Sequence, residues 1–159
     1  MNKSLNEQQL QSICDVLAHT CNGLSKSELK HILQQCNMTD EGDGSTSNGY
    51  TYTIGLNKSK WLYNCFAKEI NKRNSYNSVF TFIERAMNPI SYVNEDKRSK
   101  YDYMFEEINK VLLFIGAELS KDGKIKVAIK AQSLDEVDRR VNSLKKQLYN
   151  RAIDRKSVV

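Results

Sequence analysis

Apolar residues recur at spacings of three and four over most of the chain, which is the period of an amphipathic helix. The pattern predicts helices over residues 6–20, 25–36, 58–73, 79–87, 101–115 and 133–153. Ser25, followed three residues later by Glu28, forms the capping box that begins the second of these helices, and Ser133 caps the last. We therefore expect a mainly α fold with about six helices in one compact domain spanning residues 1–159.

Two segments interrupt the helical period. Residues 37–57 are rich in glycine, serine, asparagine and aspartate, which predicts a long loop with a short strand at residues 50–54. Residues 117–130 hold two short apolar stretches around Asp122 and Gly123, the pattern of a β-hairpin before the last helix. Ile125, Val127 and Ile129 alternate with lysines there, so we expect one apolar and one largely basic face.

The largest apolar side chains of the helices predict the core. It should contain Trp61, Phe66, Phe80, Phe82, Phe105, Ile108, Leu112 and Ile115. Ile70 belongs to the inward face of the third helix by the same spacing. In the last helix the apolar positions form a narrow seam suited to packing along one partner helix, which also makes homo-oligomerisation through this helix an alternative. The seam consists of Leu134, Val137, Val141, Leu144 and Leu148.

Composition narrows the class of protein. With 159 residues, 40% of them hydrophobic and 27% charged, the chain has the size and balance of one globular domain. No apolar stretch reaches the roughly 20 residues that a membrane span needs. The first residues are polar and lack a signal-peptide core, so we expect a cytoplasmic protein with no membrane partner.

Cysteine and histidine positions do not suggest a metal site. Cys14, Cys21, Cys36 and Cys65 form no Cys-x-x-Cys pair, and the two histidines are not at zinc-finger spacing. We expect the four cysteines to be small buried hydrophobic residues, free of disulfides and metal. Phosphate-binding loops, nucleophile elbows and zinc-protease motifs are also missing from the sequence, so we expect no enzyme and no cofactor.

The net charge of +5 is spread unevenly. Residues 1–57 carry three basic and six acidic residues, a net of −3. Residues 58–120 have a net charge of +2, and residues 121–159 have a net charge of +6. The basic C-terminal quarter is suited to attract nucleic acid, an acidic protein or an anionic surface.

Two patterns indicate a binding surface. The second and third helices with the downstream basic hairpin are the parts of a winged helix-turn-helix, although segment 37–57 is far longer than the usual turn. The last helix carries a basic strip. The candidate nucleic-acid or partner-binding residues are Lys58, Lys60, Lys68, Lys72, Arg73, Lys124, Lys126, Arg139, Arg140 and Lys146. A solvated helix face would carry the same residue types, so binding and solubility both remain open interpretations.

Several short motifs occur in an order that resembles a known family. They are Gly23-Leu24-Ser25 with Ser27-Glu28-Leu29; Ser59-Lys60-Trp61; Phe82-Ile83 with Ala86-Met87-Asn88-Pro89 and Tyr92; Asn109 with Val111-Leu112, Phe114 and Gly116; Asp122-Gly123-Lys124; and Ser133-Leu134 with Glu136. Over roughly residues 10–150 the chain resembles the N-terminal domain of Ymh-like bacterial and prophage proteins, which is related to AbiJ-type abortive-infection proteins.

The resemblance implies a role in phage defence. In that family the domain usually precedes a helical HEPN-like ribonuclease module whose motif is an arginine followed a few residues later by a histidine. Here Arg73 is the first arginine and lies after both histidines, so the motif is not formed. The resemblance therefore implies a non-catalytic sensor or adaptor whose partner is a HEPN-like effector protein. A winged-helix-like DNA- or RNA-binding protein is the alternative, and a module completed by a partner chain's nuclease centre is a third hypothesis.

Overall fold

The structure, a computed structural model, describes residues 3–47, 49, 52–53 and 55–157, and it places the side chains of these residues except 52–53 and 149–157. Contacts divide the chain into an N-terminal unit of residues 2–86 and a C-terminal unit of residues 87–159. The described residues contain six α-helices, with a small antiparallel hairpin before the last helix. The predicted mainly α fold is confirmed, while the single domain over residues 1–159 stays a prediction.

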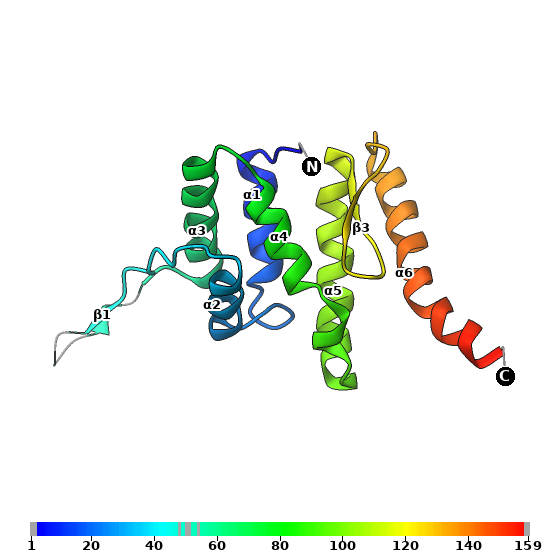
Figure 1. Cartoon of the computed structure of the whole chain (residues 1–159), viewed down its shortest axis with the longest axis horizontal. Coiled ribbons are helices and arrows are strands. Elements are labelled where there is room, and N and C mark those ends of the chain that lie inside the picture. Colours follow the sequence, from blue (N-terminus) through cyan, green and yellow to red (C-terminus); the bar gives the residue numbers. More distant parts are fainter. Residues whose placement is uncertain (1–2, 48, 50–51, 54, 158–159) are drawn as a thin grey trace. The chain divides into compact units, whose positions relative to one another are not determined.

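The N-terminal unit contains four helices. They are α1 (Glu7–Leu17), α2 (Lys26–Gln35), α3 (Lys58–Arg73) and α4 (Asn77–Ala86). Helix α1 lies beside α3, and α4 packs against both α2 and α3 (Figure 1). Phe66 and Phe82 meet edge to face with ring centres 4.9 Å apart, a preferred geometry for buried aromatic pairs. Trp61, Phe66, Phe80 and Phe82 are buried, as predicted.

Local side-chain caps explain where these helices begin. The Ser25 hydroxyl accepts a hydrogen bond from the Glu28 N–H, and the Glu28 carboxylate accepts one from the Ser25 N–H, which confirms the predicted capping box. Asn6 and Gln9 form a second capping box at α1. At α3 the Asn57 side chain accepts from the Lys60 N–H. Each cap satisfies backbone donors that the first helical turn leaves without a partner.

The first helix ends earlier than predicted, at Leu17 rather than near residue 20. The ring Nδ1 of His19 accepts hydrogen bonds from the N–H groups of Cys21 and Asn22, at 3.2 and 3.0 Å. The Leu24 N–H returns to the Leu17 carbonyl at 2.8 Å. The backbone forms a tight turn here and not a further helical turn, because the His19 ring and the Leu17 carbonyl accept hydrogen bonds from N–H groups that would otherwise continue the helix.

The predicted long loop is confirmed between α2 and α3. It contains two short antiparallel strands, β1 (Thr46–Ser47) and β2 (Tyr52–Thr53). The strand predicted at residues 50–54 therefore matches β2 in part. Residues 50, 51 and 54 of that prediction lie outside the described residues.

The C-terminal unit is built on one long helix. Its elements are the 3₁₀ turn η1 (Pro89–Tyr92), α5 (Glu95–Leu112), the 3₁₀ turn η2 (Leu113–Ile115), β3 (Ala117–Leu119), β4 (Ile125–Val127) and α6 (Leu134–Ser157). Strand β3 lies on α5, β4 pairs with β3, and α6 packs along α5 (Figure 1). Helix α5 begins six residues before the predicted start, because its first turns are polar and exposed and so carry no apolar period.

Asn109 ties the hairpin to α5. Its side chain is fully buried, and its amide nitrogen donates to the carbonyl oxygens of Phe105 and Leu119, both at 3.1 Å. Its oxygen accepts from the Leu119 N–H at 2.7 Å. The N–H and the carbonyl of Leu119 do not bond to β4, and the Asn109 amide satisfies both of them. Buried polar groups require such partners.

Some predicted core positions are wrong. Ile115 is only half-buried because it lies in η2, where the helical period no longer applies. Ile70 is also half-buried, and the neighbouring Glu69 is buried in an ion pair with Arg73. Leu134, the first residue of the predicted seam, is exposed. The remaining predicted core residues are buried, as are Val137, Val141 and Leu144 of the seam.

The predicted hairpin is present, but only Ile125 of its predicted apolar face is buried. Val127 and Ile129 are exposed, whereas Ile125 is buried. Val127 lies opposite Ala117, the first residue of β3, whose short side chain offers it little cover. Ile129 follows the end of β4. The apolar side chains after Ile125 therefore lie on the surface, outside the hydrophobic core.

The cysteines follow the prediction in part. All four are free. Cys14 and Cys65 are buried, as expected, but Cys36 is half-buried at the end of α2 and Cys21 is exposed in the turn after α1. For Cys21 the expectation of burial is wrong, because the helix that would have turned it inward ends at Leu17.

We expect Asn109→Leu to lower the free energy of unfolding by roughly 2–4 kcal/mol, because the N–H and the carbonyl of Leu119 would be left buried without partners. Urea unfolding of the full chain, followed by circular dichroism, measures the change. Asn142→Leu, on the exposed side of α6, is the matched control and should change the free energy by no more than about 0.5 kcal/mol. Equal effects of the two substitutions would contradict this role for Asn109.

Candidate binding surfaces

The basic residues predicted on α3 differ in how much of their charge is available. The Lys58 ammonium donates to the Leu24 carbonyl at 3.0 Å, and Lys68 lies 3.3 Å from the Glu41 carboxylate. Arg73 pairs with the buried Glu69. Lys60 and Lys72 are exposed, with no ion pair to the residues that the structure describes. Two of the five candidate cations on α3 thus keep an unpaired charge.

The first part of the long loop is held by charge, which sequence reasoning missed. Asp43 pairs with Lys26, and the Asp40 carboxylate accepts a hydrogen bond from the Trp61 indole N–H at 2.8 Å. Lys30 lies 3.7 Å from Asp40, and the Lys26 ammonium lies 5.3 Å from the centre of the Trp61 ring. Asp40 and Asp43 therefore neutralise Lys30 and Lys26 of α2, and their carboxylates attach the loop to the helices.

These contacts shift the pKa values of both aspartates. Partial burial works to raise the pKa of Asp40, but the hydrogen bonds from Trp61 and Gly42 and the charges of Lys30 and Lys26 together lower it. The hydrogen bond from Lys26, with those from Ser45, holds the pKa of Asp43 far below its usual range. Both carboxylates are therefore ionised at neutral pH.

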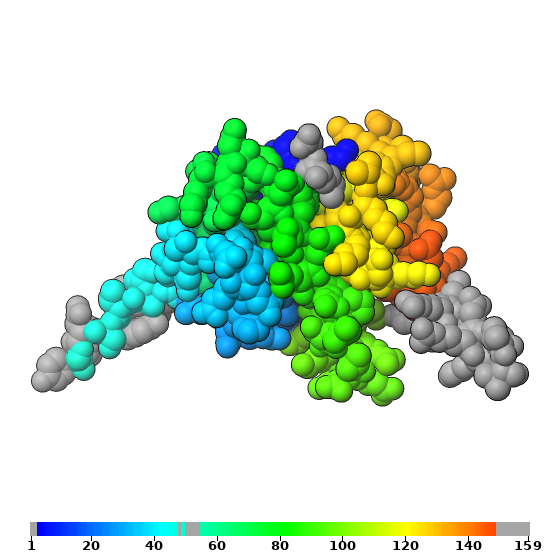
Figure 2. All heavy atoms as spheres, in the orientation of Figure 1, coloured from blue at the N-terminus to red at the C-terminus, as the bar shows by residue number. Residues whose placement is uncertain are grey.

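In the C-terminal unit, the hairpin and α6 lie side by side (Figure 2), and an open groove of about 320 Å³ lies between them. Its walls mix acidic, basic and uncharged polar side chains with one leucine. The lining residues are Glu118, Ser120, Lys121, Asp122 and Lys126 from the hairpin, and Arg140, Ser143, Leu144 and Gln147 from α6. Such a shallow and mixed surface is suited to a polypeptide more than to an enclosed small molecule.

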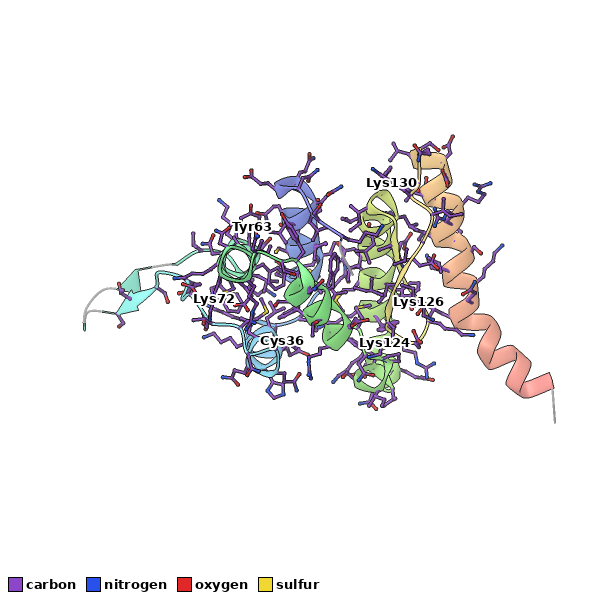
Figure 3. The ribbon with its side chains drawn as sticks, turned by 45° about the horizontal axis from the view of Figure 1, so that its top comes forward. Cys36, Tyr63, Lys72, Lys124, Lys126 and Lys130 are labelled. Carbon is purple, nitrogen blue, oxygen red and sulfur yellow. The ribbon has the colours of Figure 1, made fainter. Side chains whose placement is uncertain are left out.

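The five candidate cations of this unit also differ in whether their charge is already paired. Lys126 lies 3.7 Å from Asp122, and Arg140 donates to the Ile129 carbonyl at 2.6 Å while it pairs with Glu136. Lys124, Arg139 and Lys146 are exposed. Figure 3 shows Lys124 and Lys126 coming from the same stretch of chain as Lys130, which is exposed as well. The hairpin and the residues just after it therefore carry these three exposed basic side chains along one short segment.

Exposed apolar side chains mark the same unit. Among the described residues, six large hydrophobic side chains are exposed, and five of them lie between residues 90 and 134. These five are Ile90 at 77% exposure, Val93 at 68%, Val127 at 70%, Ile129 at 82% and Leu134 at 73%. The sixth, Leu56 at 43%, belongs to the N-terminal unit. Sequence reasoning placed Val127 and Ile129 on an apolar face and Leu134 in an apolar seam, but it gave no signal that these side chains are exposed.

Four buried or partly buried side chains are held in their protonated forms. Burial raises the pKa of Cys14, Cys65 and Cys36 above the usual thiol range. Burial, followed by the charges of Asp122 and Asp102, raises the pKa of Tyr101 to about 12. At neutral pH these groups are thiols and a phenol, which are weaker nucleophiles than their ionised forms. No cluster of three or more potential metal ligands occurs among the described residues.

Within the described ranges, no helix combines the length and apolar character of a membrane-spanning segment. No protein-family model, curated protein or solved structure matches the chain. The candidate surfaces therefore have to be interpreted from their own residues.

We expect the Trp61 contacts to fail at acid pH. Groups with a lowered folded-state pKa stabilise the fold above their unfolded value of about 3.9, and this stabilisation is lost as the pH falls through the folded value. Emission of Trp61, the only tryptophan, should therefore stay constant from about pH 7 to pH 4 and change below that. Asp40→Ala should alter the emission already at neutral pH, while Asp138→Ala on α6 should not. Emission insensitive to both acid and Asp40→Ala would contradict the assigned contacts.

Proposed function

We propose that the chain is a non-catalytic protein-binding module, a sensor or adaptor of a bacterial phage-defence system of the abortive-infection type. The observation that carries the proposal is the cluster in sequence of five large exposed apolar side chains between residues 90 and 134. Single exposed apolar residues are ordinary, whereas apolar side chains exposed next to one another, as Val127 and Ile129 are along the hairpin segment, are typical of surfaces that bind other proteins.

The distribution of charge supports the same proposal. Five of the ten candidate cations are already bonded within their own unit: Lys58, Lys68, Arg73, Lys126 and Arg140. On α6 the exposed Arg139 and Lys146 share the helix surface with the exposed Asp135 and Asp138, so that surface is mixed rather than basic. Nucleic acids are bound through many simultaneous phosphate contacts, which a mixed surface does not supply.

The biological context of the proposal comes from the resemblance to Ymh-like and AbiJ-type proteins. In that family the effector is a HEPN-like ribonuclease module. A binding module of the present kind would recognise such an effector, or the signal that releases it. The partner is therefore proposed to be a protein of the defence system, and the exposed apolar segment is proposed to be where it binds.

Nucleic-acid binding is the second candidate, favoured by the exposed and unpaired Lys60 and Lys72 on α3. Helix α3 is the second helix of the predicted helix-turn-helix, and in such motifs the second helix enters the major groove. The two lysines lie twelve positions apart, near opposite ends of the sixteen-residue helix. They would contact phosphates rather than bases if this candidate were right, because lysine ammonium groups act on phosphate as point charges.

Fluorescence anisotropy with single- and double-stranded DNA and RNA separates the two candidates. At about 150 mM salt we expect no binding tighter than the non-specific range of about 10⁻⁴ to 10⁻⁶ M. We also expect Lys60→Glu with Lys72→Glu to leave the result unchanged. Tighter binding that this double variant abolishes, with the helical circular dichroism retained, would establish the nucleic-acid candidate instead.

Affinity capture tests the proposed function directly. The tagged full chain, expressed in a phage-infected bacterial host whose lysate is treated with nucleases, should retain a HEPN-like effector protein identified by mass spectrometry. Val127→Asp with Ile129→Asp should abolish the retention, because the substitution buries unpaired charge in an apolar contact. Leu56→Asp, an exposed apolar residue of the N-terminal unit, is the matched control and should retain the protein. Retention of no protein by the unmodified chain would overturn the proposal.

A further inference from the structure

We propose that the open edge of β4 binds an extended acidic segment of the partner protein, which adds to the β3–β4 hairpin as a third strand. This inference rests on the proposed function and names the surface and the chemistry of the partner. The register of the hairpin, its exposed side chains and its charge support strand addition at this edge.

The register identifies the backbone groups that point away from the hairpin. The Ser120 N–H bonds the Lys124 carbonyl, the Ala128 N–H bonds the Gly116 carbonyl, and Glu118 lies opposite Lys126. Because bonded pairs alternate along an antiparallel ladder, the backbone groups of Ala117 and Leu119 in β3 and of Ile125 and Val127 in β4 point outward. Each strand thus has one edge that β3–β4 pairing does not use.

The two edges differ. On the β3 side, the strand packs on α5, and the side chain of Asn109 from that helix occupies both the N–H and the carbonyl of Leu119, so this edge is covered by the helix. On the β4 side, no bond to a described residue is found for the backbone groups of Val127. An exposed row of unpaired strand groups is a template for another strand.

The open part of the β4 edge is short. At one end, the Met87 carbonyl oxygen approaches Gly123 so closely that a Cβ atom there would lie 2.5 Å from it. At the other end, Arg140 occupies the Ile129 carbonyl. The open part of the edge is centred on Val127. The added segment would therefore bond the N–H and the carbonyl of Val127 and the N–H of Ile129. This is enough for a strand of a few residues.

The side chains along the edge define the chemistry of the segment. Lys124, Lys126 and Lys130 are exposed, with Lys126 also 3.7 Å from Asp122, and successive side chains on one face of a strand lie roughly 7 Å apart. Val127 and Ile129 are exposed at the intervening positions. A segment in which acidic and apolar residues alternate would place its carboxylates beside the lysines and its apolar side chains beside Val127 and Ile129. Opposite charges and apolar pairs across strands are the contacts that stabilise a sheet.

The same lysines disfavour a second copy of this chain as the occupant. If two β4 strands paired antiparallel around Val127, Lys124 of one copy would lie opposite Lys130 of the other. Pairing around Ala128 would place Lys126 opposite Lys130. Like charges directly opposite each other destabilise a strand pair. Lysines on the edge therefore reject self-pairing and admit an acidic strand.

The first test uses a labelled synthetic peptide of alternating glutamate and valine with the full chain, measured by fluorescence anisotropy. We expect binding that weakens with added salt, because the lysines are exposed. A lysine–valine peptide and a glutamate–valine peptide interrupted by proline, which cannot complete a strand, should not bind. Absence of binding of the acidic peptide at about 1 mM, or equal binding of the three peptides, would overturn the inference.

Val127→Pro tests the backbone contact by itself. Proline removes the outward N–H of Val127 and no bond of the β3–β4 ladder, and proline is tolerated on edge strands for that reason. We expect about a tenfold loss of peptide affinity, the size that one or two hydrogen bonds supply. Val127→Thr keeps the N–H and the branched side chain and is the matched control, expected to bind normally. Equal binding by Val127→Pro, with unchanged circular dichroism, would overturn strand addition.

Charge reversal keeps the test decisive if Val127→Pro fails to fold. Lys124→Glu, Lys126→Glu and Lys130→Glu together should abolish binding of the acidic peptide and create binding of the lysine–valine peptide. Lys60→Glu with Lys72→Glu, which changes exposed lysines of α3, should change neither. Unchanged peptide preference after the triple reversal, or concentration-dependent dimers of the unmodified chain that Val127→Pro abolishes, would overturn the inference.

The capture experiment separates the inference from the proposed function. If the unmodified chain retains a HEPN-like effector and the edge variants retain it equally, the edge-strand inference is wrong and the proposed function stands. If the unmodified chain retains no protein, the proposed function is wrong. Retention by the unmodified chain that is lost in both Val127→Pro and the triple reversal, but not in Val127→Thr, supports both.

Discussion

A single buried amide determines how the C-terminal unit is assembled. Helix α5 and strand β3 share no backbone ladder, so the polar groups on the outer side of β3 have to find partners elsewhere. Asn109 supplies them, with a donor and an acceptor that match the two backbone groups of Leu119. Because a half-satisfied arrangement of buried polar groups is unfavourable, the hairpin has one stable position on its helix. The burial of Leu119 and the outward position of β4 both follow from it.

Features that depend on neighbours in sequence could be predicted. The capping box at Ser25 and the cap at Ser133 involve residues three positions apart, and both are present. The burial of Trp61 and Phe105 follows from helical period alone. The prediction failed where a side chain offered the backbone another partner, as His19 does after α1. Helix boundaries depend on whether nearby side chains bond the backbone in place of the next helical turn, and the spacing of apolar residues does not show this.

The candidate surfaces could be predicted only as sets of residue types. The ten cations were found, but whether each is free depends on contacts between distant positions, such as Lys68 with Glu41. The attachment of the loop through Asp40 to Trp61 has no periodic signal at all. For Val127 and Ile129, the alternating pattern predicted the apolar face of the strand but not whether that face is buried. Burial depends on how far the opposite strand extends. Exposure is a property of tertiary packing, and it carries the functional proposal.

The two unequal edges of the hairpin have a consequence for stoichiometry. Strand addition usually threatens runaway growth, since each new strand exposes an edge for the next. Here the sheet can extend from β4 only, because Asn109 occupies the edge of β3. Each chain would therefore accept one partner segment and could not act as a link between two of them. An assembly built through this hairpin would be a discrete complex with one partner for each chain, not a fibre.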